Sequence, residues 1–234
     1  MNAAREVAIR SVGAAGDGLY QTQPGAPGYI PFALPGERWR IDGPGAPRRL
    51  TASADRVEPT CRHFGRCGGC ALQHWADDAY AVWKRDRLVS AIRRAGFDPA
   101  CVQDLVACAP ASRRRVAFAM RQGRVARVGF QERGAHRLID ISDCPVTQPV
   151  LAALPAALRR LPAMGANRAS ALATDSGVDL VLALDHEPDA GARMDLAAFA
   201  DAEDLARLSV AIDGAPHELV AERRPPTLRC GGAV

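Results

Sequence analysis

Three of the seven cysteines lie within ten residues, at a spacing that could support metal or redox chemistry. They are Cys61, Cys67 and Cys70, in the pattern Cys-x5-Cys-x2-Cys. A metal ion or cluster needs several thiolates that converge on one point. The glycines between these cysteines let a short loop turn sharply enough to bring the thiolates together. Because no secretory signal precedes them, disulfides are not expected and the triplet predicts a metal site.

Three thiolates leave one coordination position open. The candidates for a fourth ligand are Cys101, Cys108, Cys144, Cys230 or a histidine such as His63. Cys144 is favoured because it follows a predicted strand, which could return it to the loop. Ligation by thiolates alone suits a [4Fe–4S] cluster or zinc. The uneven triplet with one distant cysteine favours iron–sulfur, since zinc sites more often show paired Cys-x2-Cys motifs or mixed cysteine and histidine.

The charge distribution predicts an anionic partner. The net charge is only +4, but residues 60–137 carry 15 basic and 6 acidic side chains, whereas residues 138–234 carry 8 basic and 14 acidic ones. A middle third this basic favours nucleic acid. Lys84 is the only lysine among the 30 basic residues. A genome rich in G and C would explain this bias, and so the bias itself establishes no function.

The elements that must position these residues indicate a mixed α+β protein. Residues 5–50 alternate apolar and polar side chains between glycines and prolines, which predicts a small all-β barrel. A helix is expected from Asp77 or Asp78 to Gly96, with a buried stripe that includes Leu88 and Ala91. Residues 113–142 resemble a β-meander, which predicts a central antiparallel β-domain.

The last third continues this pattern of helices and strands. Helices are expected over Val150 to Leu161 and Asp195 to Leu208, and strands over Val178 to Leu184 and Leu208 to Ile212. The expected domains are residues 1–58 for the barrel, 59–98 for the cysteine loop and its helix, and 99–225 for the central domain.

The cysteine segment also resembles a known family. Cys-x5-Cys-Gly-Gly-Cys-x-Leu-Gln-His, from Cys61 to His74 and followed by Tyr80 and Lys84, is similar to the cluster-binding signature of the RNA uracil-C5 methyltransferases, especially the 23S rRNA enzymes. The resemblance implies a [4Fe–4S] cluster held by Cys61, Cys67, Cys70 and Cys144. The N-terminal stretch, residues 1–58 with the segment 29–37 that ends in Pro35-Gly36-Glu37, looks like the family's TRAM domain, an OB-like barrel that binds RNA. Residues 113–130 resemble the start of its central β-domain.

The resemblance also implies a catalytic domain with S-adenosylmethionine as cofactor. In the family, that domain supplies a cysteine that adds to C6 of uracil, and a base that removes the C5 proton. This sequence has no glycine-rich loop between a strand and a helix. Residues 226–234 are expected to begin that domain, and Cys230 lies too early for the nucleophile. The chain is therefore expected to be the recognition part of an RNA methyltransferase and inactive alone.

Two alternatives remain open. The first is a stand-alone RNA-binding module with iron–sulfur or zinc, which a stop codon after residue 234 would favour over an in-frame catalytic domain. The second is a ferredoxin-like redox protein, which the large basic chain disfavours. The expected partner is RNA, and more specifically rRNA. Its expected contacts are Phe64, Arg66, Lys84, Arg113, Arg114 and Arg115. A membrane partner is not expected, because no run approaches about 18 apolar residues, and the expected location is the cytoplasm.

Overall fold

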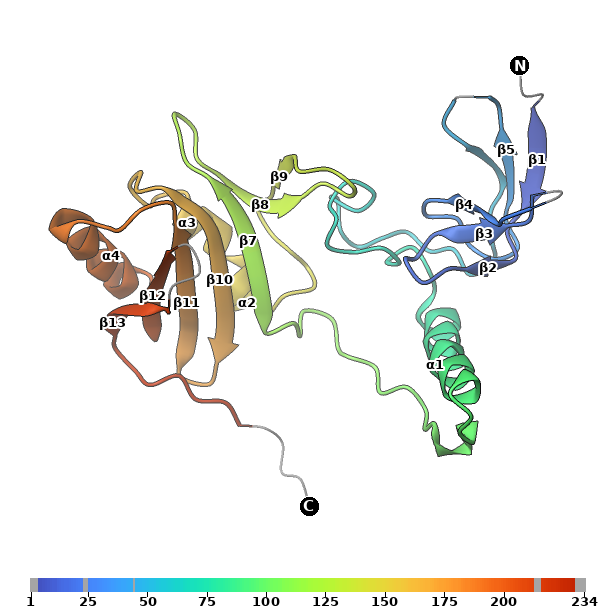
Figure 1. Cartoon of the computed structure of the whole chain (residues 1–234). Coiled ribbons are helices and arrows are strands. Elements are labelled where there is room, and N and C mark those ends of the chain that lie inside the picture. Colours follow the sequence, from blue (N-terminus) through green and yellow to red (C-terminus); the bar gives the residue numbers. More distant parts are fainter. Residues whose placement is uncertain (1–3, 23–24, 44, 213–215, 230–234) are drawn as a thin grey trace. The chain divides into compact units, whose positions relative to one another are not determined.

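The computed structural model describes residues 4–22, 25–43, 45–212 and 216–229. The chain divides into two units. The first unit comprises Met1–Gly65 and Cys70–Ala107, and the second comprises Arg66–Gly69 and Cys108–Val234. Figure 1 shows the elements of each unit along the chain. The mixed α+β class predicted from the sequence is confirmed.

Two small antiparallel sheets form the β-structure of the first unit. One has the strand order β1-β5-β6, with β1 at Arg5–Ala8, β5 at Arg38–Ile41 and β6 at Arg48–Thr51. The other has the order β2-β3-β4, with β2 at Ser11–Val12, β3 at Gly18–Tyr20 and β4 at Gly28–Ile30. A core of buried apolar side chains supports them, namely Ile9, Tyr20, Ile30 and Ala33.

The expected helix of the cysteine segment is present as α1, Asp77–Arg94. Neither aspartate is its N-cap: Ala76 takes that position, and no side chain caps the first turn. Gly96 follows the last turn with a φ of +83°, a conformation that glycine adopts without strain. The 3-10 turn η1, Pro99–Cys101, comes next.

The expected buried stripe on α1 is only partly covered, because no residue of the helix is fully buried and Tyr80 and Trp83 are half-buried. Trp75 lies in a second small core with Val12 and Leu34, and Tyr80 and Trp83 pack against it. The indole Nε1 of Trp83 donates to the carbonyl oxygen of Val12 at 3.0 Å. Further along, Leu88 is 52% exposed and Ala91 is also exposed, so the stripe prediction is wrong there.

The second unit is built on one seven-stranded sheet with the order β13-β12-β11-β10-β7-β8-β9. Its strands are β7 Arg115–Arg121, β8 Arg127–Gln131, β9 Leu138–Asp140, β10 Ala166–Thr174, β11 Gly177–Leu184, β12 Arg207–Ile212 and β13 Glu218–Glu222. The predicted meander corresponds to β7, β8 and β9. The predicted central antiparallel β-domain is corrected to a mixed sheet, because β11 and β12 run parallel while the other strand pairs are antiparallel.

The helices of this unit differ from the expected ones in their bounds. Pro155 interrupts the expected helix over Val150 to Leu161, which forms as α2, Pro149–Ala152, and α3, Leu154–Leu158. The acidic helix forms earlier than expected, as α4, Ala190–Ala202. Asp189 caps it by accepting the Ala192 N–H at 2.8 Å.

The two faces of the seven-stranded sheet differ in how far helices cover them. Alternate residues of β11 are buried, namely Val178, Leu180, Leu182 and Leu184. They share one core with apolar side chains of α2, α3 and α4, which defines the covered face. The opposite face, here called the open face, carries the half-buried and exposed residues of the same strands. No helix in the described ranges is long and apolar enough to cross a membrane.

Candidate functional site

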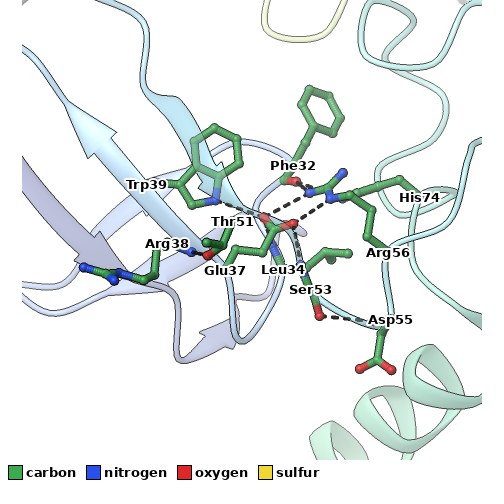
Figure 2. A network of polar contacts seen from close by, with 10 residues as sticks. All are labelled: Phe32, Leu34, Glu37, Arg38, Trp39, Thr51, Ser53, Asp55, Arg56 and His74. Carbon is green, nitrogen blue, oxygen red and sulfur yellow. Dashed lines mark hydrogen bonds and ion pairs between the residues drawn. The ribbon is translucent and has the colours of Figure 1, made fainter.

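Glu37 and Arg56 form an ion pair within a network of polar contacts in the first unit (Figure 2). Glu37 is fully buried and follows Pro35 and Gly36 in the turn before β5. Its carboxylate accepts hydrogen bonds from the Leu34 N–H at 3.0 Å and from the Arg56 Nε at 2.6 Å. Burial alone would raise the pKa of Glu37, but the hydrogen bonds from Arg56, Leu34 and Trp39 outweigh it and hold that pKa below its usual value.

The same network reaches His74, which follows the last cysteine of the motif by four residues. The carbonyl oxygen of Phe32 accepts from Arg56 at 2.7 Å and from the His74 Nε2 at 2.9 Å. Phe32 has a φ of +60°, a left-handed conformation that is uncommon outside glycine. Burial, assisted by the charge of Arg56, lowers the pKa of His74 to about 4, so the ring is neutral at pH 7.

An aromatic cluster connects the cysteine loop to this network. The ring centroid of Phe64 lies 5.1 Å from that of Phe32 and 5.0 Å from that of His74. Phe64 N–H also donates to the carbonyl oxygen of Cys61 at 3.0 Å. The half-buried Phe64 ring therefore packs within the first unit, and its predicted stacking on an RNA base stays a prediction.

The four predicted cluster ligands are divided between the units. Cys61 and Cys70 belong to the first unit, and Cys67 and Cys144 to the second. The six described cysteines are all free thiols. Among the described residues, no three His, Cys, Asp or Glu side chains form a group that could hold a metal. The ligand set therefore stays a prediction.

Cys67 lies in a segment that pairs with the end of β8. The Gly68 N–H donates to the carbonyl oxygen of Gln131 at 2.9 Å, and the Arg133 N–H donates to that of Arg66, also at 2.9 Å. A Cβ at Gly68 would lie 3.0 Å from the Gln131 oxygen, so this close pairing favours glycine. The Gly69 N–H donates to the Cys67 sulfur at 3.4 Å. Backbone donors of this kind stabilise a thiolate, which fits the donor set of an iron–sulfur site.

The predicted RNA contacts lie in different surroundings. Lys84 is exposed on α1, with its Nζ 5.3 Å from the ring centroid of Tyr80, and Arg66 is exposed too. Arg113 and Arg115 are exposed, whereas Arg114 forms an ion pair with Asp175 at 2.8 Å. Of these three arginines only Arg115 lies in β7, and Arg113 forms an isolated bridge with Thr147 just before that strand.

Two cavities on the open face of the second unit are lined by four arginines, of which the sequence predicts only Arg115 as an RNA contact. One has a volume of about 500 Å³ and is lined by residues including Arg133 and Arg168. The other, of about 420 Å³, is lined by residues including Arg115 and Arg207. Ala117 lines both cavities. Arg168 went unnoticed because the strand that carries it, β10, was not predicted.

The fold matches that of a solved RNA-modifying enzyme. A tRNA (uracil-54, C5)-methyltransferase from Pyrococcus abyssi, in complex with S-adenosyl-L-homocysteine, superposes with a TM-score of 0.61 and 16% sequence identity. The match covers 93% of this chain and 53% of that enzyme. The fold is therefore one that occurs within a methyltransferase.

Sequence relatives identify the family. An uncharacterized RNA methyltransferase of Brucella suis is 38% identical over 97% of this chain and 55% of its own length. A 23S rRNA (uracil(1939)-C(5))-methyltransferase of Halomonas elongata is 36% identical over 86% of this chain and 45% of its own length. No family model matches the chain. The chain belongs to the RNA uracil-C5 methyltransferases and spans about half the length of the curated relatives that it matches.

Proposed function

We propose that this chain is the RNA-recognition and [4Fe–4S]-binding part of an S-adenosylmethionine-dependent 23S rRNA uracil-C5 methyltransferase. The observation that carries the proposal is the 36% identity to the 23S rRNA enzyme of Halomonas elongata over 86% of the chain. The basic middle third supports RNA as the partner, since arginines neutralise phosphates. The two small sheets of the first unit support a TRAM-like, OB-like barrel.

The cluster would be held by Cys61, Cys67, Cys70 and Cys144. The cysteine spacing and the backbone donor to Cys67 support this assignment. When bound, the cluster would cross-link the segments that carry the four cysteines. Its role would be to stabilise the fold and not to react with the substrate. The buried network of Glu37, Arg56 and His74 holds the residues that flank the cysteine loop.

The methyl-transfer step would use residues outside this chain. The sequence contains no glycine-rich loop of the kind that binds the methyl donor, and residues 230–234, which include Cys230, lie outside the described residues. We therefore expect the isolated chain to bind RNA without methylating it. Transfer of a radiolabelled methyl group from S-adenosylmethionine to 23S rRNA by the isolated chain would contradict this expectation.

The direct test of the cluster is purification without oxygen, followed by analysis of iron and acid-labile sulfide and by visible absorption. The proposal predicts roughly four irons and four sulfides per chain, with broad visible absorption. Zinc in place of iron, or a chain without metal, would contradict the cluster assignment. A measurement of binding to 23S rRNA fragments independently tests the proposed RNA recognition.

A further inference from the structure

The open face of the second unit has a floor of small side chains. Strand register places Ala117 of β7 opposite Ser170 of β10, and Ala119 opposite Arg168. Ser170 in turn lies opposite Val181 of β11. Gly68, Gly69 and Gly134 line one end of the adjoining cavity without side chains. A ligand can therefore approach the sheet backbone closely along this groove, which we define as the two cavities that share Ala117.

The charged side chains that line this groove favour the binding of an anionic ligand. Four arginines line it, namely Arg115, Arg133, Arg168 and Arg207. Its two carboxylates are already neutralised. Asp179 binds Arg207 at 2.9 and 2.7 Å, and Glu132 binds Arg137, with 2.6 Å between Nε and Oε2.

Two of the groove arginines have no carboxylate of their own. The side chains of Arg115 and Arg168 are exposed and form no ion pair with any described residue. Arg115 stands in the same cross-strand row as Leu172, Asp179 and Arg207. Arg168 stands opposite Ala119, four residues along β7 and β10 from that row. The two guanidinium groups are thus available at separate points along the groove.

The groove offers more phosphate contacts than base contacts. Of its two lining rings, Phe130 is half-buried against Phe118, with ring centroids 5.3 Å apart, and only His217 is exposed. Recognition of unpaired bases usually relies on exposed aromatic platforms. Arginines over a floor of alanine, serine and glycine suit the sugar–phosphate backbone instead.

We propose that this groove binds the backbone of single-stranded RNA independently of its sequence, with Arg115 and Arg168 as phosphate contacts. The inference rests on the proposed function, because it assumes that the chain binds RNA. Cavity volumes of about 500 and 420 Å³ match those of small-ligand pockets and are suited to a few nucleotides of one strand.

Fluorescence anisotropy with a labelled uridine 12-mer tests the proposal on the full chain. Each lost contact to a single strand lowers the salt slope by about 0.7, so the double variant Arg115→Ala/Arg168→Ala should lower the slope by about 1.4. At 0.1 M salt this corresponds to a loss of affinity of roughly 10- to 25-fold. A labelled adenosine 12-mer should show the same loss, since the contacts do not read bases.

The control variant is Arg124→Ala/Arg229→Ala, which removes two exposed arginines of the same unit that line neither cavity. It should bind within about twofold of the wild type. Equal losses of RNA affinity in the two double variants would overturn the groove as the RNA site. A protein would then be the better candidate partner for the open face. A wild-type chain that binds no RNA would instead contradict the proposed function itself.

A second pair of variants distinguishes the effect of charge on RNA affinity from an effect of side-chain size on folding. Ala117 is exposed on the floor shared by both cavities, so Ala117→Glu would place a carboxylate under the bound strand. Ala117→Gln has nearly the same size without the charge. The proposal predicts that Ala117→Glu loses at least about tenfold more affinity than Ala117→Gln, as expected for like-charge repulsion. Equal affinities of these two variants would overturn it.

Discussion

The carboxylate of Glu37 and the guanidinium of Arg56 form a two-point ion pair inside the first unit. Arg56 Nε lies 2.6 Å from one carboxylate oxygen, and its second nitrogen lies 3.0 Å from the other. Glu37 is fully buried, and the side chain of Arg56 is 16% exposed. A desolvated, bidentate pair of this kind fixes the relative positions of the segments that carry it.

Removing one member of this pair should be costly. Glu37→Ala leaves the largely desolvated guanidinium of Arg56 without its carboxylate, so we expect the free energy of unfolding to fall by about 3 kcal/mol. Urea denaturation followed by tryptophan fluorescence measures this, because all three tryptophans lie in the first unit. Glu6→Ala is the control, since Glu6 forms an exposed pair with Arg38 and should cost less than about 1 kcal/mol. Similar costs for the two variants would contradict a central role for Glu37.

The first unit should lose stability in mild acid because of His74. Its pKa is lowered to about 4 in the folded chain, whereas an unfolded histidine titrates near 6.5. The unfolded state therefore binds one more proton between these values. The free energy of unfolding should fall by about 1.4 kcal/mol per pH unit as the pH drops from about 6.5 to about 4.

A variant without the imidazole identifies the source of this pH dependence. His74→Gln keeps an N–H group that can donate to the Phe32 carbonyl and removes the titration. The free energy of unfolding of His74→Gln should be lower than that of the wild type at pH 7. Between pH 6.5 and 4.5 it should change less with pH than that of the wild type. A wild-type slope that persists in His74→Gln would assign the effect to another group.

Gly129 should tolerate no side chain. A Cβ at this position would lie 1.9 Å from the carbonyl oxygen of Ile139, on the adjacent strand β9. Gly129→Ala should therefore separate β8 from β9 and cost about 3 kcal/mol or more. Hydrogen exchange of the β8 and β9 amides checks this directly. Gly123→Ala is the control, because nothing lies within 4 Å of its Cβ and exchange should stay at the wild-type rate.

The identity of the fourth cluster ligand can be tested by cysteine substitution. We expect Cys144→Ser, like Cys67→Ser, to lose most of the bound iron and the visible absorption. Cys101→Ser and Cys108→Ser are the matched controls, since both thiols are exposed, and they should keep the wild-type iron content. Iron loss in Cys108→Ser but not in Cys144→Ser would reassign the ligand.

The elements with clear alternation could be predicted from the sequence. The strands around Trp39 and Phe118 carry alternating bulky apolar and polar side chains, which is the pattern of a half-buried strand. Strand β10 was missed because it contains four alanines among nine residues, and alanine favours helices over strands. Its pairing with β7 and β11 decides its conformation, and this pairing also places Arg168 on the open face.

The buried network was not predictable in the same way. Glutamate is almost never fully buried unless it is paired, and the sequence gives no sign that Glu37 meets Arg56, 19 residues later. The only hint in the sequence is that Glu37 ends the segment 29–37, which resembles part of a TRAM domain. The start of α4 was misplaced for a local reason, because Asp189 caps the helix several residues before the apolar pattern begins.

The isolated position of Lys84 has a practical consequence. As the only lysine, exposed on α1, it is the only side-chain amine in the chain. An amine-reactive dye, applied at a pH high enough to deprotonate amines, would therefore label one known side chain in addition to the amino terminus. The arginine-rich composition thus provides a built-in attachment point for energy-transfer measurements without any engineered cysteine.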